Sequence, residues 1–165
     1  MSVMKGLSRS AMVAIAVCLP QRATAQTDSS FAALQARGKM AMGVDQYASA
    51  HQFDVTPDGG RIALEMKEND SLSIAQIRAH LKLIEHAFQA GDFSTPEFVH
   101  LRAMPGTAVM SARKAYIKYT YADLPQGGQV RISTTDPEAL AAIREFINAQ
   151  RADHHAGGHG SMPPT

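Results

Sequence analysis

The stretch YASAHQFDVTPDGGRIALEM, residues 47–66, decides the fold that we predict for this chain. From Tyr47 to Val55, alternate side chains form two sets, which is the period of a half-buried β-strand. The set expected to face the core consists of Tyr47, Ser49, His51, Phe53 and Val55. Pro57–Gly60 favours a tight turn, because proline fixes one φ angle and glycine permits positive φ. The alternation resumes from Ile62 to Met66, so the stretch predicts a β-hairpin with His51 on its buried face.

An amphipathic helix is predicted directly after this hairpin, from about Leu72 to Ala90. Ser71 is a favourable N-cap residue, and Gly91 stands where a glycine commonly ends a helix. The apolar stripe of this helix has 3.6-residue spacing and consists of Ile77, Leu81, Ile84 and Phe88. We expect the stripe to pack against the apolar side chains of a sheet, namely Ile62, Leu64, Val130 and Ile132.

The second half of the chain repeats this order of elements. Two further strands are predicted at Tyr116–Tyr121 and Gln129–Thr134, on either side of the turn-forming segment Leu124–Gly128. Asp136 caps a second helix, which has Pro137 at its first position and runs to about Arg151. The second half therefore predicts another hairpin followed by a helix.

The connection between the two halves carries a weaker pattern. Asp92–Gly106 contains two prolines and is predicted to be irregular. Val109–Ala115 is expected to add a helical turn.

The whole order predicts an α+β fold with two layers, in which two helices cover one face of a four-stranded antiparallel sheet. Its ββαββα order is consistent with an internal duplication. Residues 58–64 are similar to 126–132, and 75–81 are similar to 141–147. Chance similarity between two hairpin–helix units explains these short matches equally well.

Residues 1–25 have the features of a cleaved export signal. Lys5 and Arg9 precede the apolar run Ala11–Leu19, and Ala23-Thr-Ala25 is typical of a cleavage site. The run is shorter than the about 20 residues that a membrane span needs. We therefore expect a periplasmic or secreted protein that begins at Gln26 and is not inserted in the membrane after cleavage.

The remaining chain divides into three parts. Residues 26–45 are polar and Ala-rich, and we expect a linker or a frayed helix there because Gly38 and Gly43 interrupt the pattern. Residues 46–152 form the α+β domain. Residues 153–165 are rich in Gly and Pro and are expected to be a disordered tail that contains histidines.

Composition excludes several classes of function. The 165-residue chain has a formal charge of +1, which offers no basic surface for nucleic acid. Its one cysteine, Cys18, lies in the predicted signal, so cleavage would leave no thiolate for catalysis or metal binding. Phosphate-binding loops, nucleophile elbows and zinc-protease motifs are also absent from the sequence.

Histidine is the side chain that stands out in this cysteine-free remainder. His51 is expected on the inner face of its strand, His80 on the flank of the first helix, and His154 at the end of the second helix's packed stripe. His100 follows Phe98-Val99 in a segment of unpredicted structure. These four residues are the candidate metal ligands. Buried histidines that only satisfy local hydrogen bonds are the alternative interpretation.

Several motifs of the chain lead to a family resemblance. They are Gly43-Val-Asp-Gln-Tyr47, His51-Gln-Phe53, Pro57-Asp-Gly-Gly-Arg-Ile62, Ile77-Arg-Ala-His-Leu81, Gly91-Asp-Phe-Ser94, Val99-His100, Tyr119-Thr-Tyr121 and Asp136-Pro-Glu-Ala-Leu140. With these motifs the chain resembles a family of small exported bacterial proteins over roughly residues 42–155. Members of that family often carry the label aspartate carbamoyltransferase, with no established activity behind it.

The motifs of this chain do not support that label. Transcarbamoylases resemble one another through a Ser-Thr-Arg-Thr phosphate loop and a His-Pro-x-Gln segment. The nearest segments here are Phe93-Ser-Thr-Pro96 and Ile132-Ser-Thr-Thr135, and neither has an arginine to hold carbamoyl phosphate.

Three functions follow in order of preference. The first is an exported, non-enzymatic protein that binds or handles a metal ion through His51, His80, His100 and His154. Imidazole suits copper, zinc and nickel and thioether selects Cu(I), so a mixed His/Met site favours copper. The second is a domain that binds a small ligand or a protein and uses these histidines structurally. The third is a transferase or hydrolase with His80 or His100 as its base.

Overall fold

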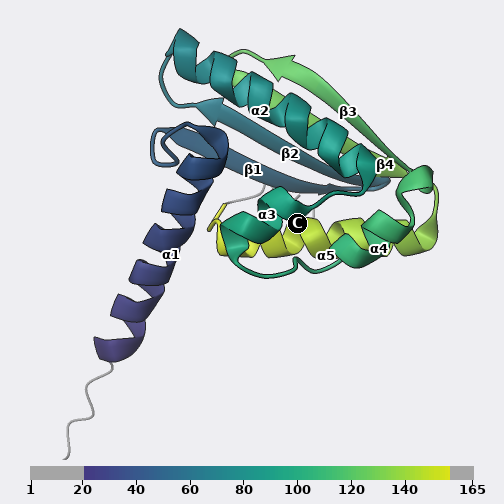
Figure 1. Cartoon of the computed structure of the whole chain (residues 1–165), viewed down its shortest axis with the longest axis horizontal. Coiled ribbons are helices and arrows are strands. Elements are labelled where there is room, and N and C mark those ends of the chain that lie inside the picture. Colours follow the sequence, from purple (N-terminus) through teal and green to yellow (C-terminus); the bar gives the residue numbers. More distant parts are fainter. Residues whose placement is uncertain (1–20, 157–165) are drawn as a thin grey trace, which may run out of the picture.

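Four antiparallel strands form a single sheet in the computed structural model of the chain, which describes residues 21–156. The strands are β1 (Ser49–Thr56), β2 (Gly59–Met66), β3 (Ile117–Leu124) and β4 (Gly127–Thr134). They lie in the order β1-β2-β4-β3, so the two hairpins meet through β2 and β4 (Figure 1). The predicted hairpins, the antiparallel sheet and the α+β class are confirmed.

One face of the sheet carries the core. Phe53 pairs with Ile62, Ile62 with Val130, and Val130 with Tyr121, so these side chains lie on the same face. Val130 is fully buried.

The first strand is shorter than predicted, because it begins at Ser49 and leaves Tyr47 61% exposed.

Val55 also departs from the predicted buried set. It is 38% exposed, because it lies near the end of β1 where the strand turns into the hairpin. The inward-facing residues of β1 are therefore Ser49, His51 and Phe53.

Two long helices cover this face, as predicted. They are α2 (Ser71–Ala90) and α5 (Pro137–Asp153). The predicted stripe of α2 is buried, and Ile74 extends it by one turn. Helix α2 contacts mainly the second hairpin, whereas α5 contacts mainly the first, so each helix crosses onto the hairpin of the other half (Figure 1).

The helix caps follow the sequence closely. Asp136 accepts a hydrogen bond from the Ala139 N–H with Pro137 at the start of α5, and Gly91 ends α2 at a φ of 80°. The predicted cap Ser71 is corrected to Asp70, whose carboxylate accepts from the backbone N–H of Leu72. Aspartate is as favourable a cap as serine, and because it lies one residue upstream, Ser71 becomes the first helical residue.

The connection expected to be irregular contains a helix. Helix α3 (Ser94–His100) lies within 92–106, and Pro96 falls in its first turn. Proline is tolerated there because that N–H has no partner within the helix. The Asp92 carboxylate accepts from the Ser94 N–H at the start of this helix. Helix α4 (Thr107–Ala112) and the short 3₁₀ turn at 114–116 occupy the predicted helical turn.

Helix α1 (Gln21–Met42) occupies most of the stretch expected to be a linker or a frayed helix. It continues through Gly38, where a Cβ atom would lie 2.9 Å from the Gln46 side-chain oxygen. The glycine thus lets α1 approach the chain that leads into β1. The last five residues of the predicted signal, 21–25, begin α1, and residues 1–20 lie outside the described part of the chain.

The C-terminal tail predicted at 153–165 begins later than expected. Asp153 is the last residue of α5, and His154 to Ala156 follow it as a turn against the domain. Residues 157–165 lie outside the described chain.

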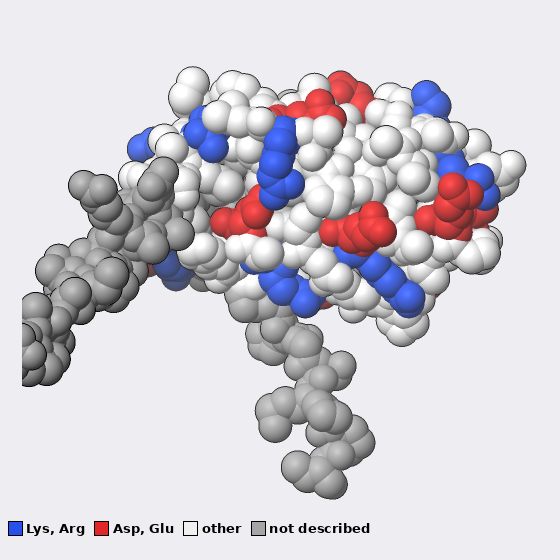
Figure 2. Space-filling model, turned by 90° about the horizontal axis from the view of Figure 1, so that it is seen from below, with Lys and Arg blue, Asp and Glu red and all other residues white. Residues whose placement is uncertain are grey.

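Acidic and basic side chains alternate on the face seen in Figure 2, without a large patch of one sign. Within residues 21–156, none of the helices combines the length and the apolarity of a membrane span.

The two covering helices diverge at one end of the sheet. Figure 1 shows α2 and α5 near each other at the end that holds α4 and well apart at the other, where α3 lies between them. The C-terminal end of α1 reaches the same region, since α1 contacts both α3 and α2. The opening between the covering helices is thus closed by α1 and α3.

Leu81 tests how the helices cover the sheet. It is 3% exposed, and we expect Leu81→Ala to lower the free energy of unfolding by about 2–5 kcal/mol through lost burial and the remaining cavity. Leu83→Ala on the same helix is the control, because Leu83 is 68% exposed and should change stability by less than about 0.5 kcal/mol. Urea denaturation measures both. Equal effects of the two substitutions would contradict the packing described.

Candidate functional site

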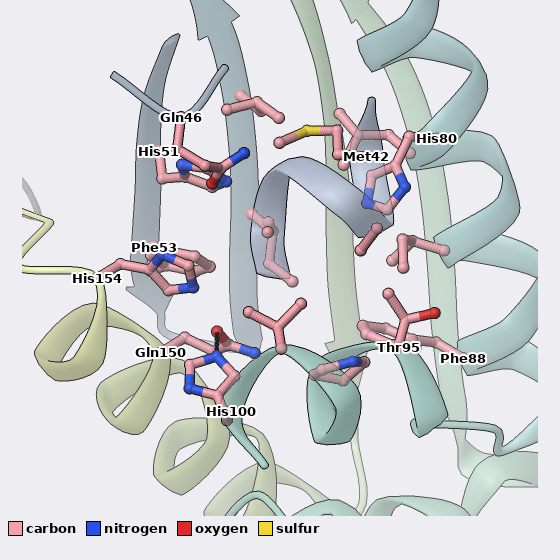
Figure 3. Close-up of a pocket in the computed structure, with 18 residues that line it drawn as sticks. Met42, Gln46, His51, Phe53, His80, Phe88, Thr95, His100, Gln150 and His154 are labelled. Carbon is pink, nitrogen blue, oxygen red and sulfur yellow. Dashed lines mark hydrogen bonds between the residues drawn. The ribbon is translucent and has the colours of Figure 1, made fainter. Parts of the chain in front are cut away.

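A cavity of about 90 Å³ lies in the opening between the covering helices, and all four candidate histidines line it (Figure 3). His51 comes from β1, His80 from α2, His100 from the end of α3, and His154 from the residue after α5. We call this cavity the histidine pocket. Its remaining wall is mostly apolar and includes Phe53, Leu64, Leu81, Ile84 and Phe88. The volume is enough for several water molecules or a small ligand.

His51 and His154 are in direct contact. Their ring centroids are 4.9 Å apart with an interplanar angle of 24°, and both rings also lie against Phe53. Strand alternation points His51 inward, and the helical spacing from Ile147 and Gln150 points His154 to the same place. Among the described residues, the side chain of His51 makes no hydrogen bond, and the buried Nδ1 of His154 has no hydrogen-bond partner.

His100 is held by hydrogen bonds on both sides of its ring. Its side chain is 1% exposed, and Nδ1 lies 2.7 Å from a carboxylate oxygen of Asp153. A carboxylate can only accept, so Nδ1 carries the proton of this bond. Nε2 lies 2.9 Å from Oε1 of Gln150, which also lines the pocket. An amide oxygen only accepts, so with the ring proton on Nδ1 this bond requires the Gln150 amide to turn and donate from its NH₂ group. The ring centroid of His100 is 5.2 Å from that of His154, edge to face.

His80 lies apart from the other three. It is partly buried on the flank of α2, and within the described chain its side chain has neither a hydrogen bond nor a ring contact. The structure thus brings His51, His100 and His154 into a chain of ring contacts and places His80 elsewhere on the wall of the same pocket (Figure 3).

Burial favours the neutral form of His51, His80 and His154. Desolvation, with a smaller contribution from His80, lowers the pKa of His51 to about 4. Desolvation and then the neighbouring His51 and His100 lower the pKa of His154 to about 3. The pKa of His80 is also lowered by burial. Neutral imidazole is the form that binds a metal ion.

The rings are not arranged as a finished metal site. No group of three His, Cys, Asp or Glu side chains in residues 21–156 is positioned to hold a metal ion. Stacked rings direct their nitrogen lone pairs within their own planes, so those of His51 and His154 do not converge. Rotation of the side chains is needed before both rings can bind one ion.

Sequence reasoning missed three residues of this site. Met42 lines the pocket from the end of α1, a stretch expected to be a linker or a frayed helix. Gln150 and Asp153 lie within hydrogen-bond distance of the two ring nitrogens of His100, and Asp153 falls in the predicted tail. The spacing of Leu34, Gly38 and Met42 on α1 is a helical signal that could have placed Met42 on a packed face.

A second cavity, of about 300 Å³, lies on the other side of His100. Arg37, Arg102 and His155 line it, and Arg102 forms an ion pair with Asp153. Asp153 is therefore neutralised outside the histidine pocket. His100 forms part of the wall between the two cavities.

Comparisons with known proteins gave no match. No family model matches the chain, and neither a curated protein nor a solved structure is similar to it. The family resemblance therefore stays a prediction, and the geometry of the site carries the functional argument.

The low pKa values predict an acid-dependent loss of stability. An unfolded histidine takes up a proton near pH 6.5, whereas folded His51 does so near pH 4, so the unfolded state binds more protons between these values. The free energy of unfolding should be highest above pH 6.5 and should fall as the pH approaches 4. His51 alone should account for a decrease on the order of 3 kcal/mol.

Urea denaturation at pH 7 and pH 5 measures this effect in the native sequence and in His51→Leu. We expect the substitution to remove part of the difference between the two pH values. His86→Gln is the control, since His86 is exposed on α2. A proton-resonance titration of His51 with a midpoint near 6.5 would contradict the burial described.

Proposed function

We propose that this chain is an exported, non-enzymatic protein that binds a late transition-metal ion in the histidine pocket. The observation that carries the proposal is the buried Nδ1 of His154, which has no hydrogen-bond partner among the described residues and lies beside the ring of His51. A buried nitrogen without a partner costs about 1–3 kcal/mol and is normally satisfied by water or an ion. An ion bound here would use both rings and remove this cost.

The hydrogen bonds of His100 support the same proposal. Metal-binding histidines commonly donate their second ring N–H to a carboxylate, which fixes the ring and makes it a better ligand. Asp153 stands in that position toward His100, and the other ring nitrogen lies on the side of Gln150 and the pocket. His100 becomes a third ligand if Gln150 gives up its hydrogen bond.

Copper is the metal that we propose for this site. Neutral imidazoles suit copper, zinc and nickel, and carboxylate ligands, which calcium and magnesium prefer, do not line the pocket within the described chain. Export of the protein rests on the predicted signal at 1–25 and would bring the pocket into contact with metal ions outside the cytoplasm.

A small organic ligand is the second candidate. The pocket is larger than one ion needs, and its apolar wall with a few polar groups is typical of small-ligand sites. A transferase acting on carbamoyl phosphate has less support, because no arginine lines the pocket in residues 21–156.

A metal titration tests the proposal. We expect the replacement of both His51 and His154 by Ala to weaken copper binding by about 100-fold or more, because loss of metal ligands removes the bonds that hold the ion. The titration uses protein that also carries His155→Ala and His159→Ala, so that the predicted tail contributes little. Affinity is measured by competition with a chelator, under reducing and oxidising conditions.

The matched control is His86→Ala in the same background, which should leave the affinity unchanged. Circular dichroism checks that each variant is folded. Unchanged copper affinity in the folded double variant would contradict the proposal and leave the small-ligand alternative.

A further inference from the structure

The histidine pocket contains a sulfur atom in addition to its imidazoles. Met42, at the C-terminal end of α1, lines the pocket and is 8% exposed, so its thioether faces protein and the cavity rather than bulk water (Figure 3). Thioether is a weak ligand for hard or divalent ions and a good ligand for Cu(I). The other three methionines of the core, Met66, Met104 and Met110, are buried outside the wall of this pocket.

The described part of the pocket wall also lacks Asp, Glu, Lys and Arg side chains. Its polar members among the described residues are imidazoles, amides and one threonine. The nearest carboxylate, Asp153, lies behind His100 and is already paired with Arg102. A bound cation therefore keeps nearly its full charge in an apolar surrounding.

The cost of burying an ion depends steeply on that charge. The Born energy of transfer from water rises with the square of the charge, so a divalent ion loses about four times as much hydration energy as a monovalent ion of equal size. Neutral ligands cannot offset this loss by neutralising the ion. A pocket with this wall consequently disfavours Zn(II) and Cu(II) relative to a monovalent ion with the same ligands.

From these two observations we infer that the histidine pocket selects a soft monovalent ion, Cu(I) or its analogue Ag(I). We infer further that the side chains of Met42, His51 and His154, which line the same cavity, turn toward this ion and bind it together. The inference rests on the proposed function and names the oxidation state and the additional ligand. Binding involves no change in oxidation state, so the ion must be offered as Cu(I) or Ag(I).

The position of Met42 makes α1 part of the site. Gly38 and Ala41 of the same helix also line the pocket, so the last turn of α1 forms one of its walls. Coordination by Met42 would join this helix to β1 and to the end of α5 through the ion. Ion binding should therefore stabilise the contact of α1 with the domain.

The experiment compares Ag(I), Cu(I), Cu(II) and Zn(II) on the full chain that carries His155→Ala and His159→Ala. Affinities are measured by chelator competition, with Cu(I) under anaerobic reducing conditions. We expect Cu(I) and Ag(I) to bind at least 100-fold more tightly than Zn(II). Met42→Leu, which nearly conserves the volume, should weaken Cu(I) and Ag(I) binding by about tenfold or more and leave Zn(II) affinity unchanged.

Met40→Leu is the matched control, because Met40 lies two residues away on α1 and is 74% exposed. It should leave all four affinities unchanged. Zn(II) or Cu(II) affinity equal to that for Cu(I), or Cu(I) binding that is insensitive to Met42→Leu, would overturn the inference. In either of these cases, the proposed function would stand if binding of the ion still required His51 and His154. Absence of binding by every ion would overturn both.

Discussion

The structure depends on covering a single apolar face of a four-stranded sheet with only two long helices. Apolar side chains from all four strands point to that face, and burial of such surface is the main source of stability. Helices α2 and α5 each lie mainly over the hairpin of the other half and diverge at one end (Figure 1). Helices α1 and α3 close the space that remains, and the histidine pocket lies where these elements meet.

His154 is an exception to the rule that buried polar groups are satisfied, because its buried Nδ1 has no hydrogen-bond partner among the described residues. Apolar side chains could fill the space between α2 and α5 without a desolvation cost. Instead, the fold buries the ring of His154 with an unpartnered nitrogen and holds His100 in place through Asp153 and Gln150. Departures of this kind from local rules are expected at functional sites, where stability is given up for binding. The unpartnered nitrogen of His154 and the held ring of His100, rather than any sequence motif, lead to the proposed metal site.

Much of the fold could be predicted from the sequence because its signals are local. Strand alternation placed His51 on the inner face, and the 3.6-residue period placed the stripe of α2 and the position of His154. Asp136 marked the start of α5 through its side-chain carboxylate, whereas Pro137 and Gly91 marked helix ends through their own backbone conformation. The similar sequences of the two halves agree with a strand order that is symmetric about the β2–β4 pair, although an internal duplication stays a prediction.

The parts of the structure that could not be predicted from the sequence depend on contacts between distant segments. Two prolines in 92–106 suggested an irregular loop, whereas Pro96 falls in the first turn of α3, which positions His100. Gly38 suggested a break, whereas it allows α1 to approach Gln46 and so brings Met42 to the pocket. Periodicity identifies the face on which a residue lies, but it does not show which distant helix packs against that face.

Anomalous X-ray scattering from crystals of the silver- or copper(I)-loaded protein tests the central claim most directly, because it locates the bound ion. Our account predicts one strong peak inside the histidine pocket, within bonding distance of ring nitrogens of His51 and His154 and of the Met42 sulfur. An empty pocket in loaded crystals, with the ion on exposed histidines such as His155, would contradict it.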